Sequence, residues 1–204
     1  MIALLDYGAG NLTSVRKAFA ALGAELQTPA APADLSSVSA IIVPGVGHFD
    51  ATCALDGHWR ETIRARLREG VPVLGICLGL QWLFDGSSEA PDARGLGVFP
   101  GTCVKLVAPK VPHVGWNSLS LIHESPLTAD IPDGAQVYFT HSYAAPVVDA
   151  TVAVANHGQA FSAIVERDNV AAVQFHPEKS AEVGLKILRN WLGVHALQTH
   201  HRLP

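Results

Sequence analysis

Residues 71–84 read VPVLGICLGLQWLF, and this stretch decides the fold. Residues 71–76 form a short, continuous apolar run, which is typical of a strand buried on both faces. Residues 78–84 have the composition of a helix start. Cys77 stands between the two, inside the pattern G-x-C-x-G that it forms with Gly75 and Gly79. The stretch therefore predicts a strand, a sharp turn and a helix in direct succession.

The same unit of strand, loop and helix occurs twice before this stretch. Its first copy occupies residues 1–22 and its second residues 40–69. In each copy an apolar run is followed by a glycine-containing loop, DYGAGN in the first and PGVG in the second, and a glycine ends the helix. Continuous apolar strands that alternate with helices predict a parallel sheet covered on both faces.

The second half of the chain has a different pattern. Its apolar segments are short and separated by turns, which predicts antiparallel hairpins. The expected strands are 98–107, 118–122, 137–139, 152–155, 162–167 and 170–175, followed by a helix over 181–192. We predict a three-layer, flavodoxin-like α/β fold whose mixed sheet has a parallel core with added antiparallel strands, in a single domain of residues 1–204.

Composition excludes several classes of function. Charged residues make up 16% of the chain and its net charge is −4, without the Lys/Arg runs that would neutralise a row of phosphates. No apolar run approaches the roughly 18 residues of a membrane span, and the amino-terminal segment does not resemble a signal peptide. We therefore expect a protein that acts neither on nucleic acid nor in a membrane.

The three cysteines, Cys53, Cys77 and Cys103, indicate a reducing environment. Their odd number argues against a disulfide framework and favours the cytoplasm. No CxxC pair is present, which argues against a thiolate metal site. We expect no metal and no cofactor. We expect His195, His200 and His201 to lie on a solvated carboxyl-terminal tail.

Cys77 is the candidate nucleophile. The glycines around it allow the backbone to turn sharply, and a position at a helix amino terminus favours a thiolate. A lone cysteine is more often an inert, buried residue, and this alternative holds for Cys53 and Cys103. For Cys77, the paired glycines between a strand and a helix favour a nucleophile over an inert, buried cysteine.

His176 and Glu178 are the candidate base and its orienting partner. They follow the predicted strand 170–175, with Pro177 between them. Residues two apart in extended chain point to the same side, so Glu178 could reach the far nitrogen of His176. Taken alone, the sequence His-Pro-Glu is more often a turn with a solvated glutamate, but beside the Cys77 motif the functional interpretation is favoured.

An acyl-transfer site also needs N–H donors for an oxyanion. Leu78 follows the nucleophile, and Val46 and Gly47 lie in the loop after a neighbouring strand. The carboxyl ends of parallel strands meet at one edge of the sheet, so we predict these donors near Cys77. The glycines of the DYGAGN loop are too few for a dinucleotide fingerprint.

The motifs GICLGLQ (75–81) and FHPE (175–178) together resemble the class I glutamine amidotransferases. Four further segments resemble one branch of that family, the glutaminase subunits of imidazole glycerol phosphate synthase. They are DYGAGN (6–11), PGVGHF (44–49), PHVGWN (112–117) and YFTHSY (138–143). Residues 84–89 depart from the larger acidic stretch that family members often carry.

The resemblance implies a reaction and a partner. Glutamine would be hydrolysed to glutamate and ammonia, with Cys77 as nucleophile, His176 as general base and acid, and Glu178 holding its tautomer. The ammonia would pass to a (β/α)₈-barrel cyclase subunit, which forms imidazole glycerol phosphate and AICAR in histidine biosynthesis. The oxyanion loop would be completed only when the loaded partner is bound.

The resemblance also implies roles for other residues. Those expected to hold the glutamine are Gly45, Gln81, His141, Ser142 and Tyr143. Those expected to face the cyclase in a heterodimer are Asn11, Trp116 and Asn117. For Trp116 the alternative is a core aromatic residue.

Three other hypotheses stay open. A glutaminase for pyridoxal phosphate or anthranilate synthesis would share the motifs around Cys77 and His176 but is not expected to carry residues 112–117 together with 138–143. A peptidase-like or deglycase-like enzyme of this fold would place its histidine directly after Cys77, where this chain has Leu78. A non-enzymatic interaction module is disfavoured by the intact set of Cys77, His176 and Glu178.

Overall fold

The central sheet is mixed, as predicted. The computed structural model describes residues 1–196. The sheet has eight strands in the order β2 (Leu26–Gln27), β1 (Ile2–Leu4), β3 (Ala40–Val43), β4 (Val73–Ile76), β13 (Val170–Val173), β12 (Ala160–Arg167), β11 (Thr151–Asn156) and β8 (Ser120–Leu121). Strands from β2 to β13 run parallel, and those from β13 to β8 pair antiparallel.

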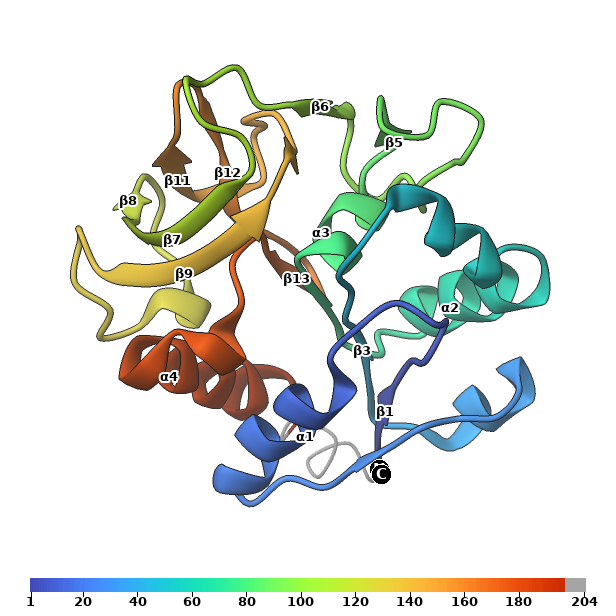
Figure 1. The fold of residues 1–204 in the computed structure, drawn as a ribbon. Helices are drawn as coiled ribbons and strands as arrows, with labels where there is room; N and C mark the ends of the chain where they lie inside the picture. Colours follow the sequence, from blue (N-terminus) through green and yellow to red (C-terminus); the bar gives the residue numbers. More distant parts are fainter. Residues whose placement is uncertain (197–204) are drawn as a thin grey trace.

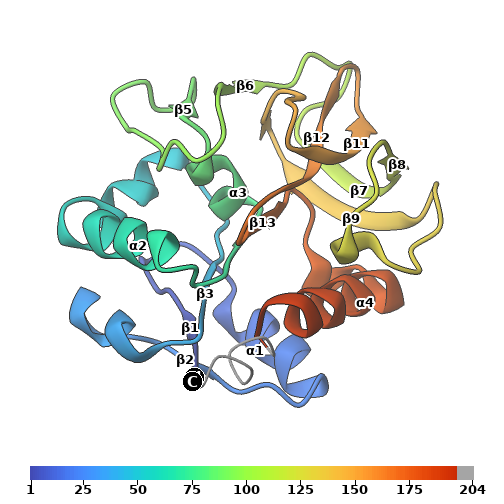
Figure 2. The ribbon, with the colours of Figure 1, turned by 180° about the vertical axis from the view of Figure 1, so that it is seen from behind.

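Helices cover both faces of the parallel core (Figures 1 and 2). α1 (Leu12–Ala21) and α4 (Ala181–Trp191) lie on one face, and α2 (His58–Arg68) and α3 (Leu78–Leu83) lie on the other. Each strand contributes to both cores because its side chains alternate: Ile2 and Leu4 pack with α1 and α4, whereas Ala3 and Leu5 pack on the opposite side. The predicted three-layer arrangement is confirmed.

Two smaller sheets lie beyond the carboxyl ends of the parallel strands (Figure 1). β7 (His113–Ser118) pairs antiparallel with β9 (Gln136–His141), and β6 (Thr102–Lys105) lies between β10 (Tyr143–Ala144) and β5 (Gly86–Ser87). Short helical turns complete the described chain: 3₁₀ turns η1 (Pro32–Ser37), η2 (Phe49–Leu55), η3 (Pro126–Thr128) and η4 (Pro177–Lys179), and the π-helical turn η5 (Leu192–Ala196). Within residues 1–196, no helix has the length and apolar character needed to cross a membrane. His200 and His201 lie outside the described residues.

Two predicted strands differ from the structure. The segment 98–107 is a strand only over β6, because Leu96 and Val98 donate backbone hydrogen bonds to the carbonyls of Trp82 and Leu83 at the end of α3. The segment 118–122 shrinks to β8, because the preceding residues form the longer strand β7. In both places, hydrogen bonds to residues distant in the sequence determine where the strand begins and ends, and the local pattern does not encode them.

Candidate active site

Cys77 lies on a strained turn at the carboxyl end of β4. Its backbone has φ 54° and ψ −104°, a conformation that residues with a side chain rarely adopt. Cys77 N donates to Val173 O at 2.8 Å and so extends the pairing of β4 with β13. A Cβ on Gly79 would lie 1.8 Å from Val43 O, and one on Gly75 would lie 2.9 Å from the Gly79 backbone. Both glycines are therefore required for the turn.

His176 and Glu178 form a buried pair beside this turn. His176 Nδ1 lies 2.8 Å from Glu178 Oε1, and the two side chains are 2% and 3% exposed. Glu178 reaches the ring through the 3₁₀ turn η4, not through extended chain. The tight turn that we weighed against a functional role for His-Pro-Glu is thus the device that brings the two groups together.

The Nε2 atom of His176 is the ring nitrogen left to interact with Cys77. Nε2 is buried and makes no hydrogen bond within the described part of the chain. Burial lowers the pKa of His176, but the interactions of the ring with Cys77, followed by those with Glu178, outweigh burial and raise the pKa to about 10. The ring is therefore equipped to hold a proton released by the sulfur.

A small cavity of about 190 Å³ opens onto Cys77. It gathers residues from α3 and from the segment that joins β9 to β10, and its lining is Gly47, Cys77, Leu78, Gln81, Glu89, Pro112, Thr140, His141, Ser142 and Tyr143. The structure thus brings Gln81, His141, Ser142 and Tyr143 to one cavity. Glu89 supplies a carboxylate there that sequence reasoning missed, because a single acid in a turn carries no distinguishing pattern.

The predicted oxyanion loop is closed against α3. Leu78 N donates to Gly45 O at 3.3 Å, and the buried Tyr7 hydroxyl donates to Pro44 O at 2.5 Å. A Cβ on Gly45 would lie 2.2 Å from Tyr7 Oη and 2.7 Å from Leu78 Cβ, so only glycine fits. Because Gly45 O occupies the Leu78 N–H, that donor becomes available to a substrate only if the loop moves.

Gln174 is a second residue that the sequence analysis missed. It is fully buried, its Nε2 donates to Cys77 Sγ at 3.6 Å, and its Oε1 accepts from Gln81 Nε2 at 3.2 Å. Gln81 Nε2 also donates to Tyr143 O at 2.8 Å. The available signal was a polar residue at the end of an otherwise apolar strand, directly before Phe175 and His176.

The residues expected to face a partner lie in different environments. Trp116 is 54% exposed and packs edge-to-face on Tyr138, with ring centroids 6.0 Å apart. Asn117 follows it on β7 and points to the opposite side, where its Nδ2 contacts His113 Nε2 at 3.2 Å. Asn11 is exposed, and its side chain caps α1 by accepting from Ser14 N.

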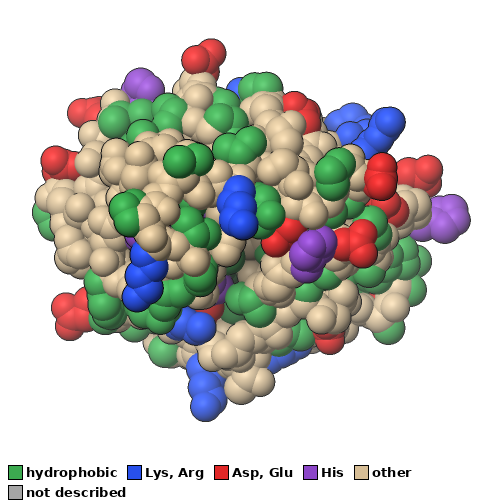
Figure 3. All heavy atoms as spheres, turned by 45° about the horizontal axis from the view of Figure 1, so that its top comes forward, with side chains coloured by type: hydrophobic (Ala, Val, Ile, Leu, Met, Phe, Trp, Pro, Cys, Tyr) green, Lys and Arg blue, Asp and Glu red, His purple; other side chains and the backbone are tan. Residues whose placement is uncertain are grey.

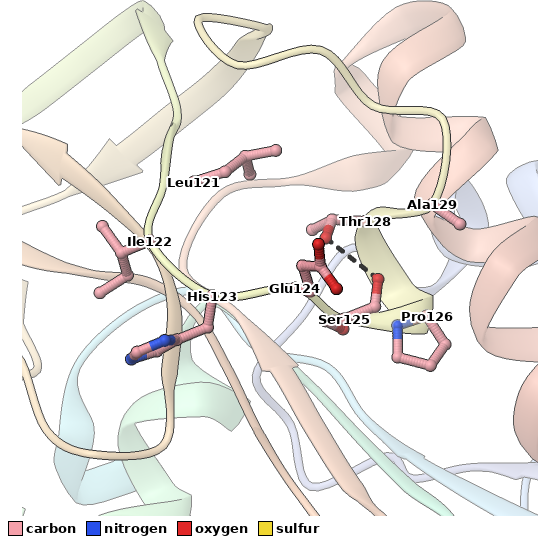
Figure 4. Close-up of a pocket in the computed structure, with 8 residues that line it drawn as sticks. All are labelled: Leu121, Ile122, His123, Glu124, Ser125, Pro126, Thr128 and Ala129. Atoms are coloured by element: carbon pink, nitrogen blue, oxygen red, sulfur yellow. Dashed lines mark hydrogen bonds between the residues drawn. The ribbon is translucent and has the colours of Figure 1, made fainter.

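A larger hollow of about 770 Å³ lies elsewhere, along residues 121–129 (Figure 4). Its lining comes from one continuous segment that runs from the end of β8 through the turn η3, and the dashed contact in the close-up joins Thr128 Oγ1 to Ser125 O. It contains no cysteine, and within the described residues its Ser125 hydroxyl donates to the carboxylate of Glu166 and not to the ring of His123. The smaller cavity at Cys77 is therefore the candidate active site.

Comparisons with known proteins agree with this geometry. The family model described as "Glutamine amidotransferase class-I" matches residues 3–193. A solved structure described as a glutamine amidotransferase superposes with a TM-score of 0.76 at 19% identity, covering 96% of this chain and 99% of that one. The structure of PurLQS from Thermotoga maritima superposes with a TM-score of 0.72 at 18% identity, covering 94% and 97%. The chain belongs to the class I glutamine amidotransferases.

Curated relatives indicate to which branch of this family the chain belongs. The imidazole glycerol phosphate synthase subunit HisH of Methanothermobacter thermautotrophicus is 43% identical over 95% of this chain and 98% of its own length. The subunit HisH of Thermococcus kodakarensis is 46% identical over 94% and 98%. Within the class I glutamine amidotransferases, the chain belongs with the HisH subunits.

Proposed function

We propose that the chain is the glutaminase subunit of an imidazole glycerol phosphate synthase. It hydrolyses glutamine to glutamate and ammonia, and the ammonia passes to a cyclase subunit that forms imidazole glycerol phosphate and AICAR in histidine biosynthesis. The observation that carries this proposal is the buried His176–Glu178 pair, held at 2.8 Å beside the strained turn of Cys77. The proposed function agrees with the identity of the relatives, which are HisH subunits 43–46% identical to this chain.

The three residues divide the chemistry between them. Cys77 Sγ attacks the side-chain amide carbon of glutamine while His176 holds the proton that the sulfur gives up. His176 then delivers this proton to the departing ammonia, leaving a thioester on Cys77. Water, deprotonated by the same ring, attacks the thioester and releases glutamate. Glu178 keeps the proton on Nδ1 and stabilises the charged ring.

The cavity supplies groups that fit the rest of the glutamine. The carboxylate of Glu89 suits the α-ammonium group, whereas Gln81, His141, Ser142 and Tyr143 surround the remainder. Gln174 donates to the sulfur and so favours its negative charge. We expect Gln174→Leu to slow turnover about tenfold, because one hydrogen bond to a charged group is lost.

The closed oxyanion loop supports an activity that depends on the partner. Val46, Gly47 and Leu78 would supply the oxyanion donors, and Leu78 N–H is engaged by Gly45 O until the loop turns over. One missing donor of this kind costs about 2.7–4 kcal/mol in the transition state. We therefore expect the isolated chain to hydrolyse glutamine poorly and the loaded cyclase to favour the open loop.

The proposed partner is the (β/α)₈-barrel cyclase in a heterodimer. The exposed Trp116 and Asn11 are its proposed contacts. Asn117 lies on the other face of β7, where its side chain contacts His113. The face seen in Figure 3 intersperses acidic, basic and hydrophobic side chains, which suits a protein partner better than a nucleic acid. Cys53, Cys77 and Cys103 are free thiols, in keeping with a proposed location in the cytoplasm.

Replacement of the nucleophile tests the proposal. In the complex with the cyclase, Cys77→Ala should abolish glutamine-dependent synthesis and leave ammonia-dependent synthesis intact, because ammonia bypasses the glutaminase site. Both rates can be measured on the same preparation. Equal loss of the two activities would contradict the proposal.

A further inference from the structure

His113 occupies a buried position next to the glutamine cavity without lining it. It lies at the start of β7, directly opposite His141 on β9. His113 is 4% exposed and His141 is 7% exposed. His113 Nδ1 and His141 Nε2 are 3.1 Å apart, and His141 lines the cavity. The mechanism above assigns no task to His113.

The hydrogen-bond partners determine which nitrogen carries each proton. Tyr143 O only accepts, so His141 Nδ1, at 2.9 Å, must donate to it. In a neutral ring Nε2 of His141 then accepts, and His113 Nδ1 is its donor. His113 Nε2 accepts in turn from Asn117 Nδ2, whose other hydrogen goes to Asn156 O at 2.9 Å. Every polar atom in this series has a complementary partner.

The environment keeps both rings neutral. Burial lowers the pKa of His141 to about 3, and burial followed by the neighbouring His157 lowers the pKa of His113 to about 4. The donor and acceptor roles above are therefore the ones that apply at neutral pH. Because the neutral ring of His113 accepts from Asn117 and donates to His141, its two hydrogen bonds fix the orientation of the His141 ring relative to Asn117.

Stacking holds the His113 ring in its plane. The ring of Phe139 lies on it with centroids 4.7 Å apart and an interplanar angle of 21°, and the ring of His157 lies at 4.2 Å and 15°. His157 is itself anchored through Nε2 to Lys110 O at 2.6 Å. The orientation of His113 is thus set by packing as well as by hydrogen bonds.

The hydrogen bonds from Asn117 through His113 and His141 end at Tyr143, in the Ser142–Tyr143 segment that lines the cavity. Tyr143 O, which accepts from His141 Nδ1, also accepts from Gln81 Nε2. Gln81 Nε2 also donates to Gln174 Oε1, and Gln174 Nε2 donates to Cys77 Sγ. A displaced His141 ring would therefore shift the Ser142–Tyr143 segment relative to the nucleophile.

We propose that His113 is a positioning residue for glutamine binding, which fixes the ring of His141 and with it the Ser142–Tyr143 wall of the cavity. This inference rests on the proposed glutaminase function. The strand β7 gives it a second consequence. Val114 and Trp116 are exposed on the face opposite to His113, so a partner that docks on them contacts the same strand that orients His141.

Three substitutions of His113 separate its hydrogen bonds from its packing. His113→Asn places an amide N–H at the position of Nδ1 and keeps the donor to His141. His113→Gln places its amide near Nε2 and keeps only the contact with Asn117. His113→Phe keeps the stacked ring and loses both hydrogen bonds. His157→Phe is the matched control, since it alters the same stack without breaking the series from Asn117 to Tyr143.

In the complex with the cyclase, His113→Gln and His113→Phe should raise the KM for glutamine about tenfold with a smaller change in kcat, because a buried acceptor on His141 is left unpaired. His113→Asn should return the KM to within about threefold of wild type, and His157→Phe should leave it unchanged. Ammonia-dependent synthesis should be equal in all of them. A wild-type KM in both His113→Phe and His113→Gln overturns the proposal, as does an equal rise in His113→Asn and His113→Gln.

The isolated chain gives an independent measurement. Inactivation by a glutamine-mimicking chloroketone should need higher concentrations for half-saturation in His113→Gln and His113→Phe, whereas alkylation by iodoacetamide, which does not use the cavity, should proceed at the wild-type rate. Unchanged half-saturation in both variants overturns the proposal. Should His113→Phe fail to fold, the Asn and Gln variants decide by the same comparison. Loss of synthesis by the wild-type complex would refute the proposed function while this inactivation series still tests His113.

Discussion

The parallel core and the β7–β9 sheet contribute to the same cavity by different means. The core supplies Cys77 and His176 from two adjacent strands, β4 and β13, whose carboxyl ends are fixed by a parallel register. The β7–β9 sheet supplies His141 and its support, held by side-chain contacts across an exposed antiparallel pair. Cys77 and His176 are therefore placed by backbone geometry, and His141 by its contact with the buried side chain of His113.

The largest effect is expected where the core orients its base. Glu178→Gln should lower glutamine-dependent turnover by about a thousandfold or more, because an amide no longer enforces the tautomer of His176 or balances its charge. Steady-state kinetics of the complex measure the loss. Glu182→Gln, an exposed acid at the start of α4, is the control and should retain wild-type turnover. A loss below about tenfold would show that Glu178 does not hold the ring.

The next effect concerns the turn itself. Gly79→Ala should lower the free energy of unfolding by about 3 kcal/mol or more, because its Cβ would lie 1.8 Å from Val43 O, a rigid backbone atom. Gly193→Ala, where a new Cβ meets nothing within 4 Å, should be neutral or slightly stabilising. Urea unfolding of both variants makes the measurement. Equal stability of the two would mean that the backbone around Cys77 can relax.

A smaller effect is expected on the outer face of β7. Trp116→Ala should change the stability of the isolated chain by less than about 0.5 kcal/mol, since the side chain is 54% exposed. The same change should weaken binding to the cyclase by about tenfold or more, as expected for an aromatic residue at an interface. Calorimetric titration with the cyclase measures the affinity. Wild-type affinity would remove Trp116 from the proposed contact.

The smallest effect is a dependence of stability on acid. His113 and His141 have folded pKa values lowered to about 4 and about 3, so they are neutral in the folded chain where the unfolded chain is protonated. Their stabilising contribution is complete above the unfolded value near 6.5 and is lost as the pH falls toward 4. Unfolding between these limits should take up about two protons from this pair. Melting temperatures measured from pH 7 to pH 4.5 should fall less steeply in His113→Phe than in wild type, and parallel curves would contradict the assignment.

The sequence by itself determined the parts of the molecule whose signals are local. A glycine pair around Cys77 predicts a tight turn because a Cβ cannot fit there, and the close approach of neighbouring backbone atoms to Gly75 and Gly79 supplies the reason. Alternating strands and helices predicted the parallel core, since continuous apolar strands must be covered on both faces. The His-Pro-Glu motif identified His176 and Glu178 as candidates, although the segment forms a 3₁₀ turn and not the extended chain that we expected.

Only the tertiary structure decided how the cavity is built. Glu89 and Gln174 are single polar residues without a motif, and they become functional candidates only because folding brings them to Cys77 across 12 and 97 positions of the chain. His113 and Asn117 form their series with His141 because β7 pairs with β9 in one particular register. Such contacts depend on long-range pairing and on which face a side chain occupies, and neither is encoded in the residues next to it.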